Sequence, residues 1–472
     1  MYTMSIYQTS QQDYEQQLLE KFKDLIVEHN EQTGSNIPTE YELELSKTQK
    51  HAFERFKRGE SLLILGTAGC GKSFLIKQFY KWITNTQQKT MYLTSTTGIS
   101  AYNIGGITIN SFMGIGTGES SVETIIRRLK YKTSIKNRIK MTDILVIDEI
   151  SMMSASVFEK INHICQILKR SNKPFGGIQI ILTGDFLQLE TIFNSTTSLN
   201  NNSCDNRLII ESELFKKIFS KSTIILQENF RQKTDTKYID ILMRIRKGIQ
   251  NENDIKTLKT RLIDTDNNSL IHLVSSNKKA QMINSKQLNK IKSDDVVFEC
   301  QFSRYGNTET CDLLEKELRS QFSQRGIDTL KLRKGCRVLL IKNLDVSLGL
   351  VNGSIGTVKD FINNKVVVEF DNGVTERIGK IEWELEMDNS KIVATQIPFM
   401  LAYSITIHKS QSLSLDKAIL DLADCFCNHM VYVALSRVRS LEGVYLHSFD
   451  QKKITVNQKL LDFINEIETI KV

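Results

Sequence analysis

The sequence lacks the features of secreted and membrane proteins. None of its apolar runs approaches the roughly 18 residues that a membrane span requires, and residues 1–6 do not place a basic region before an apolar one. The eight cysteines show no C-x-x-C spacing, and Cys425 and Cys427 are too close together for an ordinary zinc knuckle. We therefore expect reduced thiols in an intracellular protein, nuclear or cytoplasmic, that is neither secreted nor inserted into a membrane.

Length and charge limit the number of domains and the kinds of partner. A chain of 472 residues is too long for one hydrophobic core, so we expect roughly two to four domains. The formal net charge of +8 is mild, and a solvated basic surface explains it as well as a nucleic-acid partner does. Between Glu123 and Asp143 no acidic residue occurs, and this stretch either forms a solvated helix face or follows a phosphate backbone. Its basic residues are Arg127, Arg128, Lys130, Lys132, Lys136, Arg138 and Lys140.

A phosphate-binding loop is the most informative motif. The apolar run 62–65 leads directly into the pattern G-x-x-x-x-G-K-S, formed by Gly66, Thr67, Ala68, Gly69, Cys70, Gly71, Lys72 and Ser73. The glycines let backbone N–H groups point at phosphate oxygens, Lys72 is placed to reach the β and γ phosphates, and Ser73 is placed to ligate Mg²⁺. The pattern predicts binding of a nucleoside triphosphate, and many different NTPases share it.

Alternating apolar runs and helical stretches predict two α/β domains with parallel sheets. We place the first domain at 41–205 and the second at 206–334 and 389–472. The runs of the first domain are 61–65, 91–93, 144–147 and 178–182, and those of the second are 223–226, 270–274, 417–420 and 443–446.

Three further segments complete the predicted organisation. Residues 1–40 form a polar N-terminal extension with one helix at 13–28. The Asn, Ser and Thr-rich residues 193–206 form the linker between the two α/β domains. Short β-type runs separated by Asn-Gly turns predict a small all-β barrel inserted at 335–388. These runs are 337–341, 355–359 and 365–370.

Polar residues at strand ends carry the predicted chemistry. Asp148 and Glu149 follow the run 144–147, where Asp148 is suited to hold Mg²⁺ and Glu149 to deprotonate the water that attacks the γ phosphate. Gln188, after another strand, is placed to sense the γ phosphate. Arg231 and Arg437 either stabilise charge on the transferred phosphoryl group or are ordinary surface arginines.

Taken in order along the chain, these segments resemble superfamily 1B helicases and, within them, the Pif family. Residues 45–49 are similar to its glutamine motif, and two segments are similar to motif Ia, 94–101 and 106–112. Motifs II, III, V and VI are similar to 148–152, 184–189, 401–411 and 432–439, and the family's own signature to 173–179.

The resemblance implies an ATP- and Mg²⁺-dependent helicase that moves 5′ to 3′ on single-stranded DNA and unwinds tailed duplex DNA, with G-quadruplexes as a further substrate. It implies two tandem RecA-like domains, an SH3-like 2B module at 335–388 and a small 1B wedge within 101–140. We expect a monomer that acts in replication, repair or recombination. Three prolines and abundant Lys, Asn and Ile fit an AT-rich genome, and such a core suits a large DNA virus as well as a cell.

The resemblance also implies the roles of individual residues. Gln49 would read the adenine base, and Arg231 and Arg437 would be arginine fingers. The residues expected to contact the DNA strand are Thr94, Thr96, Ser111, Phe112, His408 and Lys409.

Three departures from the family pattern stand out. Glu190 and Thr191 replace the usual proline pair after Gln188 and Leu189, Asn110 stands where histidine is common, and Ser412 where glycine is common. The first departure keeps open an alternative, a DNA-stimulated ATPase or switch that binds single-stranded DNA without productive unwinding. A phosphotransferase built on the same loop would leave the second α/β domain unexplained.

Overall fold

A six-stranded parallel sheet forms the first half of the fold. The computed structural model describes residues 45–470 apart from 87–88, 117–119, 191–206, 232–234, 264–269, 346–347, 351, 388–389 and 412. The helix predicted at 13–28 and the linker predicted at 193–206 lie outside these residues.

The strand order of the six-stranded sheet is β3-β2-β4-β5-β1-β6. The bounds are β1 Leu62–Gly66, β2 Met91–Ser95, β3 Ile107–Thr108, β4 Ile144–Asp148, β5 Gln179–Gly184 and β6 Thr223–Leu226.

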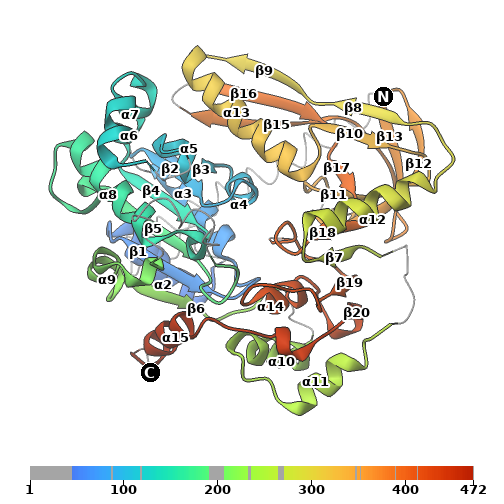
Figure 1. Cartoon of the computed structure of the whole chain (residues 1–472). Coiled ribbons are helices and arrows are strands. Elements are labelled where there is room, and N and C mark those ends of the chain that lie inside the picture. The colour runs from blue at the N-terminus through green and yellow to red at the C-terminus, as the bar shows by residue number, and fades with distance from the viewer. Residues whose placement is uncertain are drawn as a thin grey trace, which may run out of the picture. The chain divides into compact units, whose positions relative to one another are not determined.

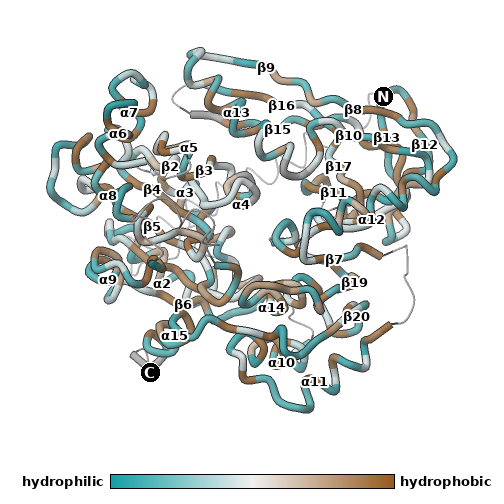
Figure 2. Tube along the Cα trace, viewed as in Figure 1, coloured by the Kyte–Doolittle hydropathy of each residue, from teal (hydrophilic) through white to brown (hydrophobic). Residues whose placement is uncertain are grey.

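Continuous burial explains why these strands are nearly all apolar. Every residue of β1, β4 and β5 is buried, as expected for a parallel sheet with helices on both faces. Figure 2 shows hydrophobic residues along β4 and β5. The helices of this half are α2 Lys47–Lys57, α3 Lys72–Thr86, α4 Gly98–Asn103, α5 Ile109–Met113, α6 Val122–Leu129, α7 Thr133–Met141, α8 Ala155–Lys169 and α9 Glu213–Phe219.

The strand at Thr223–Leu226 corrects one prediction. Its bounds agree with the predicted run 223–226, but it pairs in parallel with β1, with Leu63 opposite Thr223. Its assignment to the second α/β domain is therefore wrong. A four-residue apolar run shows that a buried strand forms but not which sheet it joins, and here the chain returns to the first sheet before it enters the second.

The second sheet has four parallel strands in the order β18-β7-β19-β20. Figure 1 shows the yellow-green β7 in one sheet with orange and red strands from the C-terminal part of the chain. The strands are β7 His272–Val274, β18 Ser404–Thr406, β19 Ala418–Asp421 and β20 Val444–Ser448, and the helices of this half are α10 Thr236–Lys247, α11 Glu252–Lys259, α12 Asn277–Asn289, α14 Met430–Leu435 and α15 Gln458–Ile470. The predicted α/β class with parallel sheets is confirmed.

Antiparallel strands occupy the chain between β7 and β18. A five-stranded sheet has the order β14-β13-β12-β11-β17, and two smaller sheets have the orders β15-β16-β9 and β10-β8. The three predicted β runs are present as β11 Arg337–Leu340, β12 Ile355–Ile362 and β13 Lys365–Phe370. The other elements are β8 Val296–Glu299, β9 Gln301–Tyr305, α13 Thr308–Arg325, β10 Thr329–Leu332, β14 Thr375–Ile378, β15 Ile381–Met387, β16 Ser390–Gln396 and β17 Phe399–Leu401. Antiparallel pairing thus begins well before residue 335, and the limits of an inserted domain stay a prediction.

Two further findings concern the division of the chain into units and its helices. Residues 1–50 form one unit and residues 51–472 another, and Gln49 belongs to the first unit. Within the described ranges, no helix is both long and apolar enough to cross a bilayer.

Candidate active site

The phosphate loop joins β1 to α3 in a conformation that two of its glycines make possible. Gly69 and Gly71 both have a φ angle of 84°, in the left-handed region that other L-residues rarely adopt. A Cβ atom on Gly69 would also lie 2.5 Å from the Cβ of Arg231. The Phe230 N–H donates to the Gly69 carbonyl at 2.9 Å. The loop and the segment that carries Arg231 therefore pack backbone against backbone.

Lys72, the first residue of α3, is held against the loop by backbone carbonyls. Its Nζ donates to the carbonyl oxygens of Gly66 at 2.7 Å and Thr67 at 3.1 Å. Burial acts to lower the pKa of Lys72, but four neighbouring groups raise it, and the net pKa lies above the ordinary value. These groups are Cys70, Asp185, Glu149 and Asp148. Lys72 is therefore a charged ammonium, able to exchange its carbonyl partners for phosphate oxygens.

Asp148 ends β4 with both carboxylate oxygens fixed. Its Oδ2 accepts from Ser100 Oγ at 2.7 Å and its Oδ1 from Thr183 Oγ1 at 2.5 Å. Across the described ranges, no three His, Cys, Asp or Glu side chains gather as a metal cage. Asp148 and Ser73 nevertheless fit Mg²⁺, which usually takes one or two carboxylates and fills its other positions with water and substrate phosphate.

Glu149 has the backbone and the acidity of a functional residue. Its φ of 54° places a non-glycine residue in the left-handed region, and its carbonyl accepts from Thr96 Oγ1 at 2.7 Å. Burial, together with the charge of Asp148, raises the pKa of Glu149 to about 7. A carboxylate with a pKa near the working pH is suited to general-base catalysis.

Gln188 lies in the turn that follows β5. Its Nε2 donates to Asp185 Oδ2 at 3.3 Å, and the side chain is buried at 5% exposure. Asp185 also forms an ion pair with Arg246 of α10, at 2.6 Å from Oδ1 to Nη2. The orientation of Gln188 is thus fixed partly from the second half of the fold.

Arg231 and Arg437 are both bound to Ser436, although about two hundred residues of chain separate them. Arg231 Nη1 donates to the Ser436 carbonyl at 3.2 Å. Arg437 Nε donates to the Val433 carbonyl at 3.0 Å, and its Nη2 to Ser436 Oγ at 2.8 Å. Burial and the neighbouring charge of Arg437 lower the pKa of Arg231 to about 9. Two guanidinium groups held this close favour an anion beside them.

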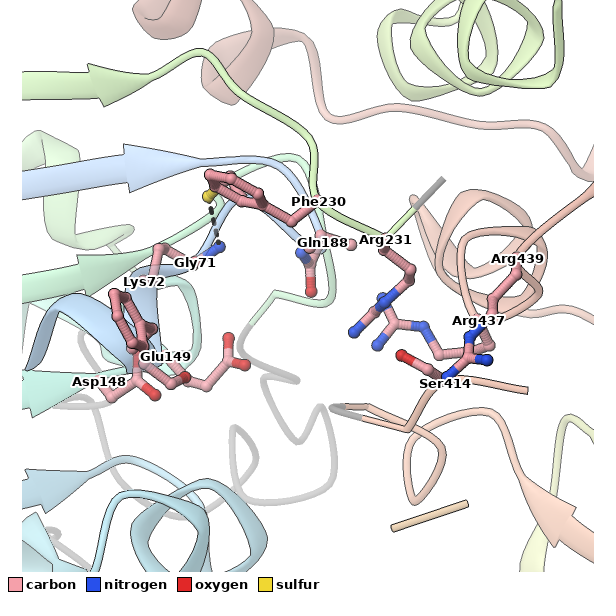
Figure 3. Close-up of a pocket in the computed structure, with 15 residues that line it drawn as sticks. Gly71, Lys72, Asp148, Glu149, Gln188, Phe230, Arg231, Ser414, Arg437 and Arg439 are labelled. Atoms are coloured by element: carbon pink, nitrogen blue, oxygen red, sulfur yellow. Dashed lines mark hydrogen bonds between the residues drawn. The ribbon is translucent and has the colours of Figure 1, made fainter. Parts of the chain in front are cut away.

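These groups converge on one cavity of about 670 Å³. Figure 3 shows Lys72, Asp148 and Glu149 on one side of it and Arg231 and Arg437 on the other. The six residues predicted to be catalytic all line it: Lys72, Asp148, Glu149, Gln188, Arg231 and Arg437. Of the predicted nucleotide-binding residues, Ala68, Gly69, Cys70, Gly71, Lys72 and Ser73 also line it.

Sequence reasoning missed four residues of this cavity: Phe74, Phe230, Ser414 and Arg439. Arg439 lies inside the segment 432–439 that resembles motif VI, and Phe230 directly precedes Arg231, so their positions beside the predicted arginines were the available indication. Ser414 has no such indication, because its segment reaches the cavity only through the tertiary fold.

Gln49 belongs to the unit of residues 1–50. The Ser46 N–H donates to Gln49 Oε1 at 3.0 Å, so the amide takes part in the turn that begins α2. Its role as a reader of adenine stays a prediction.

A second cavity of about 420 Å³ contains two of the residues predicted to contact DNA, His408 and Lys409. Burial lowers the pKa of both side chains. Glu149 lines this cavity as well as the first. One catalytic carboxylate therefore borders both the candidate nucleotide site and the candidate DNA site.

Phe426 is a neighbour of this cavity that sequence reasoning missed. It is 62% exposed, and its ring stacks on His408 with centroids 6.1 Å apart and an interplanar angle of 19°. An exposed aromatic ring beside a lysine-lined cavity fits a nucleobase. An isolated Phe in a Cys-rich segment carried no such indication in the sequence.

Two predicted DNA contacts disagree with the structure. Thr94 is fully buried, and its hydroxyl donates to the Val146 carbonyl at 2.6 Å within the sheet. Phe112 is 1% exposed and packs on Tyr92, with the Arg138 guanidinium 4.8 Å from its ring centroid. Both side chains belong to the buried core beneath motif Ia, so neither is exposed to a DNA strand in this conformation.

Ser111 and its neighbour Thr108 bind a carboxylate from α13. Ser111 Oγ donates to Glu317 Oε2, and Thr108 Oγ1 donates to the same oxygen at 3.1 Å. The Thr108 N–H donates to Glu317 Oε1 at 3.3 Å. Glu317 thus takes the hydroxyl and amide donors that a DNA phosphate would use.

The basic stretch forms α6 and α7. Arg127, Arg128, Lys130, Lys132 and Lys140 are exposed, whereas Arg138 is buried. Arg138 Nη2 donates to the Ser111 carbonyl at 3.2 Å. The stretch therefore combines a solvated basic face with one structural arginine.

The sequence matches known helicases over most of its length. Residues 44–256 match the family described as PIF1-like helicase, and residues 321–361 match the one described as DNA helicase Pif1, 2B domain. The ATP-dependent DNA helicase PIF1 of Danio rerio is 33% identical over 90% of this chain and 64% of its own length. The chain thus spans just under two thirds of that relative. The ATP-dependent DNA helicase Pif1 of Bdellovibrio bacteriovorus is 31% identical over 91% of this chain and 93% of its own length.

A solved structure shares the architecture. The Pif1 helicase from Bacteroides, in complex with ADP-AlF3 and single-stranded DNA, superposes with a TM-score of 0.60 at 27% identity. The match covers 91% of this chain and 98% of that one.

We predict that Gly69→Ala weakens ATP binding about tenfold or more, because Ala resists a positive φ by roughly 1–2 kcal/mol and its Cβ would meet Arg231. Fluorescent-nucleotide titration measures the effect. Gly59→Ala is the matched control, since Gly59 has a φ of 81° with nothing within 4 Å of an added Cβ. Equal losses in the two variants would contradict the role assigned to the loop.

Proposed function

Since the chain belongs to the PIF1-like helicase family, we propose that it is an ATP-dependent DNA helicase that moves 5′ to 3′ on single-stranded DNA and unwinds duplex DNA. One observation carries this proposal. A phosphate loop and two acids from the first sheet face Arg437 from the second half of the fold across one cavity, and Arg231, which follows β6, lies beside the loop. A site divided in this way links nucleotide chemistry to movement between two parts of the protein.

The donors around the cavity fit a nucleoside triphosphate. Lys72 and the loop amides would bind the phosphates, and the glycine backbone leaves space that side chains would fill. ATP would supply the phosphoanhydride bond, and Mg²⁺ would neutralise its phosphate oxygens. Asp148 and Ser73 are the residues suited to hold Mg²⁺, with Ser100 and Thr183 fixing the Asp148 carboxylate.

Hydrolysis would depend on a proton acceptor and on charge stabilisation. Glu149 would accept a proton from the attacking water, a role that a pKa of about 7 supports. Arg231 and Arg437 would stabilise the negative charge that develops on the transferred phosphoryl group. Arg231 would stay beside the loop, since Phe230 binds the Gly69 carbonyl, and the bond from Arg231 to the Ser436 carbonyl would help to place Arg437 in the site.

The DNA strand would pass the cavity formed by His408 and Lys409. Lys409 would contact phosphate, and the stack of His408 and Phe426 would support a base. Thr96 connects this side to the acids, because its hydroxyl donates to the Glu149 carbonyl. Ser111 would contact the strand once Glu317 leaves it.

The remaining features follow the family. We propose that the two α/β halves are RecA-like domains and that the five-stranded antiparallel sheet belongs to an SH3-like 2B module. G-quadruplex DNA, together with replication, repair and recombination, forms the proposed substrate and setting inside the cell. We propose that the protein acts as a monomer.

A second function is favoured by one observation, the replacement of the usual proline pair after Leu189. A protein altered at this motif would hydrolyse ATP when it binds single-stranded DNA but would not separate strands. It would act as a switch or as a translocase.

We predict that Lys72→Ala and Glu149→Gln each lower DNA-stimulated ATP turnover by at least about 10²-fold, the usual cost of removing one catalytic group. Binding of single-stranded DNA should be largely unchanged, because Lys72 lies outside the second cavity and Glu149, which lines it, is replaced by a side chain of the same shape. Phosphate release and fluorescence anisotropy measure the two properties. Lys77→Ala, an exposed lysine on the same helix, is the control. Turnover retained in Lys72→Ala or Glu149→Gln would remove these roles.

For the DNA site, we predict that Phe426→Ala raises the dissociation constant for single-stranded DNA about tenfold, within the roughly 1–3 kcal/mol that one stacked base contributes. Ile167→Ala is the control, since Ile167 is 51% exposed on α8 and lines neither cavity. Equal affinity of both variants would exclude Phe426 from the strand path.

A further inference from the structure

Glu190 occupies the position where the family pattern has a proline. A proline side chain accepts no hydrogen bond, whereas a carboxylate offers two oxygens as acceptors. Glu190 lies two residues after Gln188, in the turn that begins at Asp185. The substitution therefore places a new pair of acceptors next to the residue proposed to sense the γ phosphate.

Both oxygens of Glu190 are bound by amides from the other end of the chain. Asn428 Nδ2 donates to Glu190 Oε1 at 2.8 Å, and Asn457 Nδ2 donates to Glu190 Oε2 at 2.6 Å. Hydrogen bonds to an ionised acceptor are shorter and roughly twice as strong as those between neutral groups. The contact is thus directional and joins the turn after β5 to two separate segments.

The segments that carry Asn428 and Asn457 are also hydrogen-bonded to each other. The His429 N–H donates to the Thr455 carbonyl at 2.8 Å, and the Asn457 N–H donates to His429 Nε2 at 3.2 Å. Burial lowers the pKa of His429 to about 4, so the ring is neutral and Nε2 can accept. Asn428 and Asn457 therefore form one receptor for the carboxylate.

The receptor leads directly to an arginine of the catalytic cavity. Asn428 stands just before α14, which spans Met430–Leu435, and Arg437 follows that helix. Arg437 Nε is bound to the Val433 carbonyl inside α14. A displacement of Glu190 would thus be passed to Arg437 through one short, buried helix.

A second contact holds the other flank of Gln188. Arg246 donates to both oxygens of Asp185, from Nη2 at 2.6 Å and from Nε at 3.3 Å. Gln188 Nε2 donates to Asp185 Oδ2. Gln188 is therefore held between two anchors, Asp185 and Glu190, and each anchor is bound by residues from beyond the first sheet.

We propose that Glu190 is a positioning residue that, with Asn428 and Asn457, joins Gln188 to α14 so that the γ-phosphate sensor and Arg437 move as one unit. The proposal rests on the proposed function, because it assumes that Gln188 and Arg437 act on the same phosphate. The family has a proline pair after motif III, and this chain lacks it. Here the hydrogen bonds of Glu190 to Asn428 and Asn457, which we call the clamp, would connect motif III to α14 instead.

The test compares steady-state ATP hydrolysis, with saturating single-stranded DNA, across variants of the full chain. We expect Glu190→Ala to lower kcat about tenfold, within the range of measured coupling effects, while KM for ATP stays within about twofold. Glu190→Gln should keep most of the activity, because its amide can still bind both asparagines after one of them rotates. Asn457→Ala, which removes one arm of the clamp without touching the buried turn, should lower kcat by a smaller factor.

A double-mutant cycle separates positioning from simple loss of structure. If Glu190 acts through Gln188, Glu190→Ala should change kcat less than about twofold in a Gln188→Ala background. Glu213→Ala is the matched control, since Glu213 is an exposed glutamate on α9 that pairs with Lys216 along its own helix. Thermal unfolding of each variant identifies any that fail to fold.

Three results would overturn the proposal. They are an unchanged kcat in Glu190→Ala, an equal loss with and without Gln188, and a loss in Glu190→Gln as large as that in Glu190→Ala. Lys72→Ala distinguishes this failure from failure of the proposed function. If Lys72→Ala is inactive while Glu190→Ala equals the unmodified protein, only the clamp is wrong, whereas an active Lys72→Ala removes the ATPase assignment itself.

Discussion

The placement of Arg231 and Arg437 around Ser436 is the constraint on which the rest of the structure depends. Burial, together with the neighbouring charge of Arg437, lowers the pKa of Arg231 to about 9, so the charged guanidinium carries a cost in this site. Across the cavity, burial and neighbouring acids raise the pKa of Glu149 to about 7. A polyanion with a divalent cation between these groups relieves both strains, since it neutralises the arginines and the carboxylates together. The electrostatics of the cavity thus favour the ligand that the phosphate loop is suited to bind.

This arrangement also explains how ATP hydrolysis would depend on movement between the two halves of the fold. The loop, Asp148 and Glu149 belong to the first sheet, whereas Arg437 follows α14 in the second half of the fold. Glu149 borders the second cavity as well, where His408 and Lys409 lie. In the proposed mechanism, binding of DNA there and closure of Arg437 would both act on this carboxylate.

The sequence alone could predict the residues whose chemistry is local. The glycines of the loop, the strand that ends in Asp148, and the buried strands of both sheets all follow from short patterns, because a buried parallel strand must be apolar and a phosphate loop must contain glycine. Arg231 and Arg437 became predictable only through the family resemblance, since an arginine in a short polar context has no pattern of its own.

What the sequence could not predict depends on tertiary contacts. The run 223–226 identified a strand but not its partner, and β6 joined the first sheet. Thr94 and Phe112 lie in a DNA-contacting motif, yet packing against Val146 and Tyr92 buries them. The bonds from Asn428 and Asn457 to Glu190 join residues more than two hundred positions apart, and no local pattern contains such a pairing.

Strand displacement on tailed duplexes tests the central claim most directly. Two substrates of the same duplex would be compared, one with a 5′ and one with a 3′ single-stranded tail, in the presence of ATP and Mg²⁺. The account predicts displacement from the 5′-tailed substrate alone. Displacement from the 3′ tail would contradict the polarity, and none from either, with DNA-stimulated hydrolysis intact, would contradict unwinding and favour the switch or translocase.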